Sequence, residues 1–285
     1  MSPKVLLGSL FEYALIGAGW WLLWKLYCSK EAKTKSQSPR LPHWEISTPT
    51  FFAAALFVLG AWFLAQIAAG SLASHFPGLK NDAPLAAIVL GGMAQILLLA
   101  GCAAAAAYLK REYTTTSRQN QPAARNVAIA LWPAAFVTCI VTISVVYPVQ
   151  LLWEKLLQLV HLPTDKQEMI EIFFQAASPL RLAGLIVMAV VLAPVGEELV
   201  FRAGLFRFLR GRVPRWVALS LPALMFASLH VGANLKGLIT VAPLTALGIV
   251  FSIAYERTGR IAVPILAHAL FNLHTVVFLL LGLEN

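Results

Sequence analysis

The sequence predicts an all-α polytopic membrane protein with about eight transmembrane helices that enclose an intramembrane cavity. Hydrophobic residues make up 59% of the chain and charged residues only 12%, whereas soluble domains have about 45–50% apolar and about 25% charged residues. The mean hydropathy is +0.74. The apolar residues are also gathered into long runs, and a helix needs about 20 such residues to cross a bilayer.

Eight hydrophobic stretches of this kind follow one another along the chain. In order, they are 5–27, 51–71, 84–109, 127–152, 182–209, 216–231, 237–255 and 261–283. The first lacks the cleavage pattern of a signal peptide, so we expect a retained helix. The fifth stretch is longer than a span requires and the sixth is shorter, so we expect the helix ends there to differ from these bounds by several residues.

The net charge of +9 is explained by the loops between the spans. With eight spans, the loops after the first, third, fifth and seventh hold 14 Lys and Arg residues, with Arg207 at the end of the fifth stretch counted among them, and the other three loops hold five. By the positive-inside rule the richer loops face the cytoplasm and both termini face the opposite side. This pattern predicts a multi-pass protein of the plasma or inner membrane, with the lipid bilayer as a partner and no nucleic acid.

No linker divides the chain, so residues 1–285 are expected to form a single membrane domain. Between the fourth and fifth stretches, Pro163 precedes Asp165 and Glu168, which are spaced like a capping box, and the apolar run MIEIFF follows. This pattern predicts a short interfacial helix on the non-cytoplasmic side.

The fifth stretch contains two adjacent acids, Glu197 and Glu198, with Arg202 four residues after the second. An unpaired carboxylate in hydrocarbon costs at least ~2.5 to 3.5 kcal/mol, so such groups are functional candidates by default. The four-residue spacing puts Glu198 and Arg202 on one helix face, where they can pair. Glu197 is rotated by ~100° from that face, which leaves it available to take a proton from water.

Two further polar pairs follow, each with the four-residue helical spacing. Phe226 precedes His230 in the sixth stretch, and His268 precedes Asn272 in the last one. Glu197 and His230 are almost equally far in sequence from the turn between the fifth and sixth stretches, so an antiparallel hairpin brings them to the same level. We therefore expect Glu197, both histidines and Asn272 to converge around one cavity.

Each of these residues also has a simple structural interpretation. A single intramembrane histidine can be a packing residue, and Glu198 with Arg202 can be a structural ion pair. It is improbable that all of these motif residues serve packing alone in a chain with only 13 acidic residues. We therefore favour a hydrolytic site. The isolated polar residues of the other stretches are assigned to packing or interhelical hydrogen bonds. They are Glu12, Gln66, Gln95 and His274.

With these motifs, the chain resembles the CAAX protease and bacteriocin-processing family (CPBP or Abi) of intramembrane proteases, related to the CAAX prenyl endopeptidases. The matching motifs are EExxxR, FxxxH and HxxxN, in this order. The resemblance covers about residues 180–275, which would form the protease core, and leaves the N-terminal spans within residues 1–126 without motif support.

The resemblance implies an intramembrane endopeptidase with a cavity open to the cytoplasm. Its substrate would be a membrane-associated or CAAX-like protein or peptide, with prenylated proteins among the candidates. Glu197 and His230 would activate water, and His268 and Asn272 would stabilise the oxyanion. The residues that support the site would be Glu198, Arg202 and Phe226.

The cofactor and the function have alternatives. Members of the family are called metalloproteases, and Glu197, His230 and His268 could complete a zinc shell with water as the fourth ligand. The helical zinc motif HExxH is absent, and activation of water without a metal is slightly favoured. The alternatives to a protease are a catalytically silent scaffold or immunity-type membrane protein, and a proton-coupled transporter that uses the two glutamates as a relay.

Overall fold

The computed structural model describes residues 3–29, 41, 44–116, 130–164, 168–176, 178–231 and 236–283. All regular elements within these ranges are helices, and the described residues contain no strand. Seven helical segments are long and apolar enough to cross a membrane. The predicted all-α polytopic membrane fold is therefore confirmed.

The predicted sixth span is the one that the structure shortens. Seven of the eight hydrophobic stretches correspond to the long segments, whereas the sixth forms α11 (Arg215–Ser228), a helix of 14 residues. At 1.5 Å per residue this helix is about 21 Å long, which is less than the bilayer core of about 30 Å. The helix ends three residues before the predicted end of this stretch.

The N-terminal half contains three of the long segments. The first consists of α1 (Pro3–Leu23) with the π-helical turn η1 (Trp24–Cys28). The second is α3 (Thr48–His75), and the third joins α4 (Ala83–Ala86), η3 (Ala87–Gly91) and α5 (Gly92–Thr116); the short 3₁₀ helix η2 (Pro77–Asn81) lies between them.

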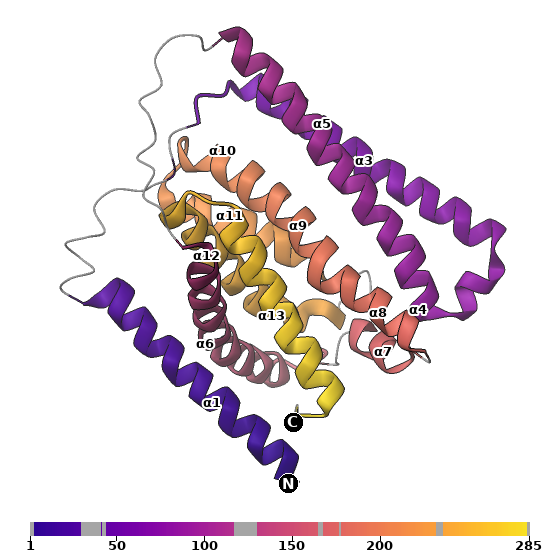
Figure 1. Cartoon of the computed structure of the whole chain (residues 1–285), viewed down its shortest axis with the longest axis vertical. Coiled ribbons are helices and arrows are strands. Elements are labelled where there is room, and N and C mark those ends of the chain that lie inside the picture. Colours follow the sequence, from indigo (N-terminus) through magenta and orange to yellow (C-terminus); the bar gives the residue numbers. More distant parts are fainter. Residues whose placement is uncertain are drawn as a thin grey trace.

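Helices α3 and α5 form a long antiparallel pair on one side of the molecule (Figure 1). The two backbones approach closely at Gly101, where an added Cβ would lie 2.6 Å from the Cβ of Ala61 and 2.8 Å from the carbonyl oxygen of Phe57. Only glycine fits such an approach, which is a common device of membrane helix pairs.

The C-terminal half begins with α6 (Leu131–Leu159) and the short α7 (Glu168–Phe174). Helix α7 lies where the interfacial helix is predicted; Asp165 of the predicted capping box lies outside the described residues. The fifth span then runs without interruption through α8 (Pro179–Val187), η4 (Met188–Leu192), α9 (Ala193–Glu198), η5 (Leu199–Phe206) and α10 (Arg207–Arg210). After α11 come η6 (Lys236–Thr240), α12 (Val241–Thr258) and α13 (Ala262–Leu281).

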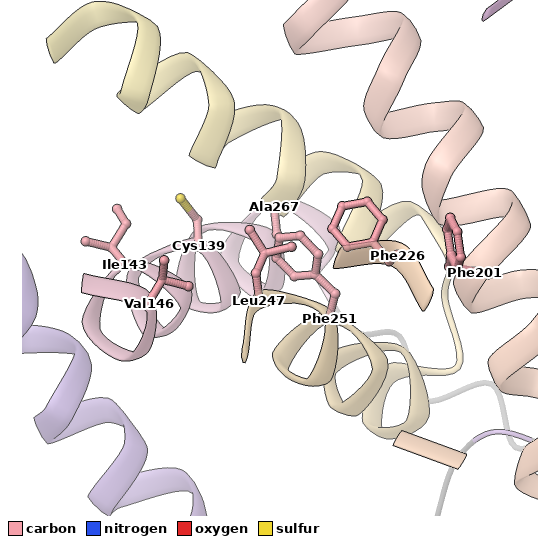
Figure 2. Packing of buried hydrophobic residues seen from close by; sticks show 8 residues of the cluster. All are labelled: Cys139, Ile143, Val146, Phe201, Phe226, Leu247, Phe251 and Ala267. Atoms are coloured by element: carbon pink, nitrogen blue, oxygen red, sulfur yellow. The ribbon is translucent and has the colours of Figure 1, made fainter. Parts of the chain in front are cut away.

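The main core lies where α6, η5, α11, α12 and α13 meet (Figure 2). It is built from apolar side chains and extends to the motif residue Phe226, whose ring meets the ring of Phe201 edge to face at 5.4 Å. The members of this cluster are Cys139, Ile143, Val146, Phe201, Phe226, Leu247, Phe251 and Ala267. The motif helices are therefore anchored to one another by close packing.

Both ends of the chain lie at the same end of the molecule (Figure 1). A Cβ added to Gly8 in α1 would lie 2.9 Å from the Cβ of Leu283, and the rings of Phe11 and Phe278 have centroids 6.1 Å apart. This arrangement agrees with an even number of crossings.

The basic segments gather at the opposite end from the termini. Arg257 after the last-but-one span donates to the carbonyl oxygen of Leu26 at 3.1 Å, and Arg212 donates to the carbonyl oxygen of Ile46. The segments that follow the first, fifth and seventh predicted spans thus lie together, as the charge alternation requires. The orientation of this end toward the cytoplasm stays a prediction.

Candidate active site

The adjacent glutamates lie where the helical geometry of the fifth span changes. Glu197 and Glu198 end the short α-helix α9, between the π-helical segments η4 and η5. Pro194 lies close to the junction of η4 and α9, and inside a continuous helix a proline removes one backbone hydrogen bond. π-Helical turns are rare and occur frequently at functional sites.

The ion pair expected from the four-residue spacing forms. Arg202 Nη1 donates to Glu198 Oε1 at 2.9 Å, and the two side chains are 1% and 0% exposed. The guanidinium lies 5.0 Å from the ring centroid of Phe226 and 5.5 Å from that of Phe251. These aromatic faces attract a cation, so two further helices hold Arg202 in place.

Glu198 has a second contact that the sequence did not predict. Nδ1 of His268 lies 2.9 Å from the same Oε1 atom. An ionised carboxylate only accepts hydrogen bonds, so beside it Nδ1 is the donor. Glu198 was expected to serve helix geometry with Arg202 alone, but it also fixes the orientation of the His268 ring. Because the two residues are 70 positions apart, no spacing rule could have found this contact.

The other ring nitrogen of His268 faces the first glutamate. Nε2 lies 3.7 Å from Glu197 Oε2, which is beyond hydrogen-bond distance. The side chain of Glu197 is 21% exposed, whereas those of His268 and Glu198 are 5% and 0% exposed. Of the two acids, Glu197 is therefore the one that water or a substrate can reach.

His230 lies near this group without joining it directly. Its Nδ1 is 2.9 Å from the carbonyl oxygen of Phe226, and its ring meets the Phe226 ring edge to face with centroids 4.8 Å apart. The side chain is exposed. Among the described residues, no hydrogen bond or ion pair joins His230 to Glu197, so Nε2 is the nitrogen that remains for another partner.

Asn272 lies one turn after His268 on α13, and its amide is partly engaged. Its Nδ2 donates to the carbonyl oxygen of Ala189 in η4 at 2.7 Å. This bond joins α13 to the fifth span two turns before the glutamates. One of the two amide hydrogens is thereby used, and the second has no acceptor among the described residues.

The three candidate zinc ligands, Glu197, His230 and His268, do not gather into a cluster that could hold a metal ion. In the described part of the chain, no three His, Cys, Asp or Glu side chains lie close enough to hold a metal ion together. One nitrogen of each histidine already faces a protein oxygen.

Comparison with known proteins supports the motif assignment. Residues 179–274 match the family described as "Type II CAAX prenyl endopeptidase Rce1-like". The "Putative membrane peptidase YdiL" of Bacillus subtilis is 33% identical over 101 residues, which are 35% of this chain and 39% of that protein. An "Uncharacterized 24.3 kDa protein" of Escherichia coli is 31% identical over 80 residues, 27% of this chain and 36% of that protein.

The chain thus spans well under half the length of the curated relatives it matches. No solved structure matches it. The matched segment contains all three motifs, so the resemblance predicted from them is confirmed for residues 179–274.

Proposed function

We propose that this chain, a relative of the Type II CAAX prenyl endopeptidases over residues 179–274, is an intramembrane endopeptidase. The observation that carries the proposal is a continuous series of buried contacts that ends at an accessible carboxylate. Arg202 binds Glu198, Glu198 holds Nδ1 of His268, and Nε2 of His268 faces Glu197. A fixed histidine beside an accessible acid is the arrangement that activation of water requires.

In the proposed reaction, Glu197 is the general base. It takes a proton from a water molecule, and the resulting hydroxide adds to the carbonyl carbon of the scissile peptide bond. Glu197 then gives this proton to the nitrogen of the leaving amine as the C–N bond breaks. His230, whose Nε2 has no partner in the part of the chain that the structure describes, helps to position the water.

The negative charge that develops on the carbonyl oxygen needs hydrogen-bond donors. We assign this role to Nε2 of His268 in its protonated form and to the second amide hydrogen of Asn272. Glu198 supports the positive charge on the His268 ring because it lies 2.9 Å from Nδ1. A single oxyanion donor is worth about 2.7 to 4 kcal/mol of transition-state stabilisation where this has been tested.

The proposed substrate is a protein or peptide at the membrane, and it enters the site from the cytoplasmic side. Glu197 and His268 lie on helical segments long and apolar enough to cross a membrane, so the scissile bond must lie within or next to the bilayer. A lipid-modified segment is suited to this position, since each buried CH₂ of a lipid chain adds about 0.8 kcal/mol of membrane binding. Prenylated peptides are therefore the first substrates to test.

The test uses the purified full-length chain in lipid nanodiscs and a quenched fluorescent peptide with a farnesylated cysteine near its C-terminus. The same peptide without the lipid is assayed in parallel. We expect Glu197→Gln to lower the rate by about 10²- to 10⁴-fold, because glutamine keeps the size of the side chain but cannot take the proton. The melting temperature should barely change. Glu12→Gln in α1 serves as the matched control and should keep full activity.

Three outcomes separate the alternatives. Undiminished cleavage by Glu197→Gln would reject Glu197 as the base. Loss of cleavage with a chelator, restored by zinc, would keep the protease and replace metal-free activation of water. A wild-type chain that cleaves neither peptide, while Glu197→Gln alters proton-driven uptake into vesicles, would favour the transporter over the protease.

A further inference from the structure

Helix α5, outside the matched segment, lies along the helix that carries the glutamates (Figure 1). The contacts between the third and fifth apolar segments follow the same order along both of them, so the two segments run parallel from their first residues to their middle. Asp82 and Arg181 form an ion pair at 2.7 Å. Further along, Gly184 packs against Ile88, Met188 packs against Gly91 and Gly92, and Gly196 packs against Gln95 and Leu98. The fourth contact brings α5 to the level of the proposed catalytic base.

Gln95 and Gly196 approach each other unusually closely. A Cβ added to Gly196 would lie 2.9 Å from Oε1 of Gln95 and 3.2 Å from Cδ2 of Leu98. Gly196 immediately precedes Glu197, whose Cα is therefore 3.8 Å from that of Gly196. The amide of Gln95 thus reaches α9 within one residue of Glu197.

The carbonyl oxygen of the Gln95 side chain has no hydrogen-bond donor within the described ranges. Among the described residues, Oε1 of Gln95 is one of the few buried side-chain atoms without a hydrogen-bond partner. Most buried polar atoms are paired, and an unpaired one costs free energy. Since none of the described residues supplies this donor, a water molecule or a bound ligand could do so.

We propose that Gln95 is a substrate-binding residue, whose Oε1 accepts a hydrogen bond from a backbone N–H of the peptide bound beside Glu197. This inference rests on the proposed endopeptidase function. A peptide backbone is an extended row of N–H donors, and in a low-dielectric site each of them needs an acceptor. The N-terminal α3–α5 pair would then form one wall of the substrate site, although it carries none of the three motifs.

The first test replaces Gln95 with leucine. We expect KM for the farnesylated peptide to rise about 5- to 10-fold, equivalent to about 1 to 1.4 kcal/mol, while kcat changes by less than about twofold. A hydrogen bond that is present in both the bound substrate and the transition state affects KM in this way. The melting temperature should stay the same or rise, because leucine removes a buried acceptor that has no partner. Gln66→Leu in α3 is the matched control and should change neither constant.

The second test displaces Gln95 without replacing it. In Gly196→Ala the new methyl group would push against the end of the flexible Gln95 side chain, which can move away at little cost. We expect KM to rise to a similar extent in this variant. Adding Gln95→Leu to Gly196→Ala should cause less than a further twofold rise, because both changes remove the same hydrogen bond.

The outcomes for this inference differ from those for the proposed function. Unchanged KM in Gln95→Leu, with wild-type cleavage intact, would assign Gln95 to packing and leave the endopeptidase in place. A lower melting temperature of Gln95→Leu would show an internal hydrogen-bond partner and would overturn the inference whatever the activity. A wild-type chain that cleaves neither peptide would instead reject the endopeptidase on which the inference rests.

Discussion

Replacing one partner of the buried Glu198–Arg202 pair should destabilise the protein, and the structure predicts which replacement costs more. Removing one member of a buried ion pair costs about 3 to 5 kcal/mol, because the other charge stays buried without a counter-ion. In Arg202→Met, Glu198 keeps His268 at 2.9 Å, and this ring can become the counter-ion when it is protonated. We expect a loss of about 3 kcal/mol, at the lower end of this range.

The opposite replacement, Glu198→Gln, leaves the guanidinium of Arg202 between two aromatic rings. A cation over an aromatic face gains about 0.5 to 2 kcal/mol, which is less than the lost carboxylate supplied. We therefore expect a loss of about 4 to 5 kcal/mol, at the upper end of the range. The double variant contains neither charge, so its loss should be clearly smaller than the sum of the two single losses.

The measurement is the free energy of unfolding of the purified chain, determined by denaturant titration in nanodiscs for the wild type, both single variants and the double variant. The double-mutant cycle should give a coupling energy of about 3 kcal/mol, at the upper end for residues in contact. The double variant should not cleave the peptide, since its His268 has lost the carboxylate of Glu198. An unchanged stability of Arg202→Met, or a double variant as unstable as the sum of the single ones, would refute the buried charge pair.

The helix contacts and the charged ends of the spans carry three further predictions. Gly19→Ala should lower the free energy of unfolding by about 1 to 3 kcal/mol, because the new Cβ would overlap Oγ of Ser144 on α6. The control Gly17→Ala has open space around its Cβ, and identical thermal melts of the two variants would contradict the packing of α1 on α6. Glu256→Gln should cost about 1 to 2 kcal/mol, because the acceptor of two partly exposed arginines loses its charge; a melting temperature equal to that of the wild type would contradict this role. A topology reporter fused after Asn285 should be active only on the non-cytoplasmic side, and cytoplasmic activity would reverse the proposed orientation.

Helical periodicity made part of the site predictable. Residues four apart share a helix face whatever the rest of the fold does, so the pairing of Glu198 with Arg202 could be deduced from the sequence. Phe226 and His230 also lie in contact on one face. The same local argument separated Glu197 from the ion pair, and the structure leaves Glu197 as the more exposed of the two acids.

The assignment of Gln95 to packing or interhelical bonding was made without knowledge of its neighbours. The sequence shows a polar residue in an apolar helix but not which helix lies beside it. Its contact with Gly196 joins residues 101 positions apart. The π-helical turns around the glutamates were likewise not predicted, since hydropathy indicates an apolar run but not the geometry of each turn.

By itself, the sequence determined the membrane class, the order of the spans and the set of motif residues. These properties depend on composition and on spacing along one helix, which are local. Only the tertiary structure decided that Glu198 holds His268, that Asn272 binds Ala189 and that α5 reaches the level of Glu197. Such contacts depend on how separate helices pack against one another, and packing is set by the shapes of many side chains together.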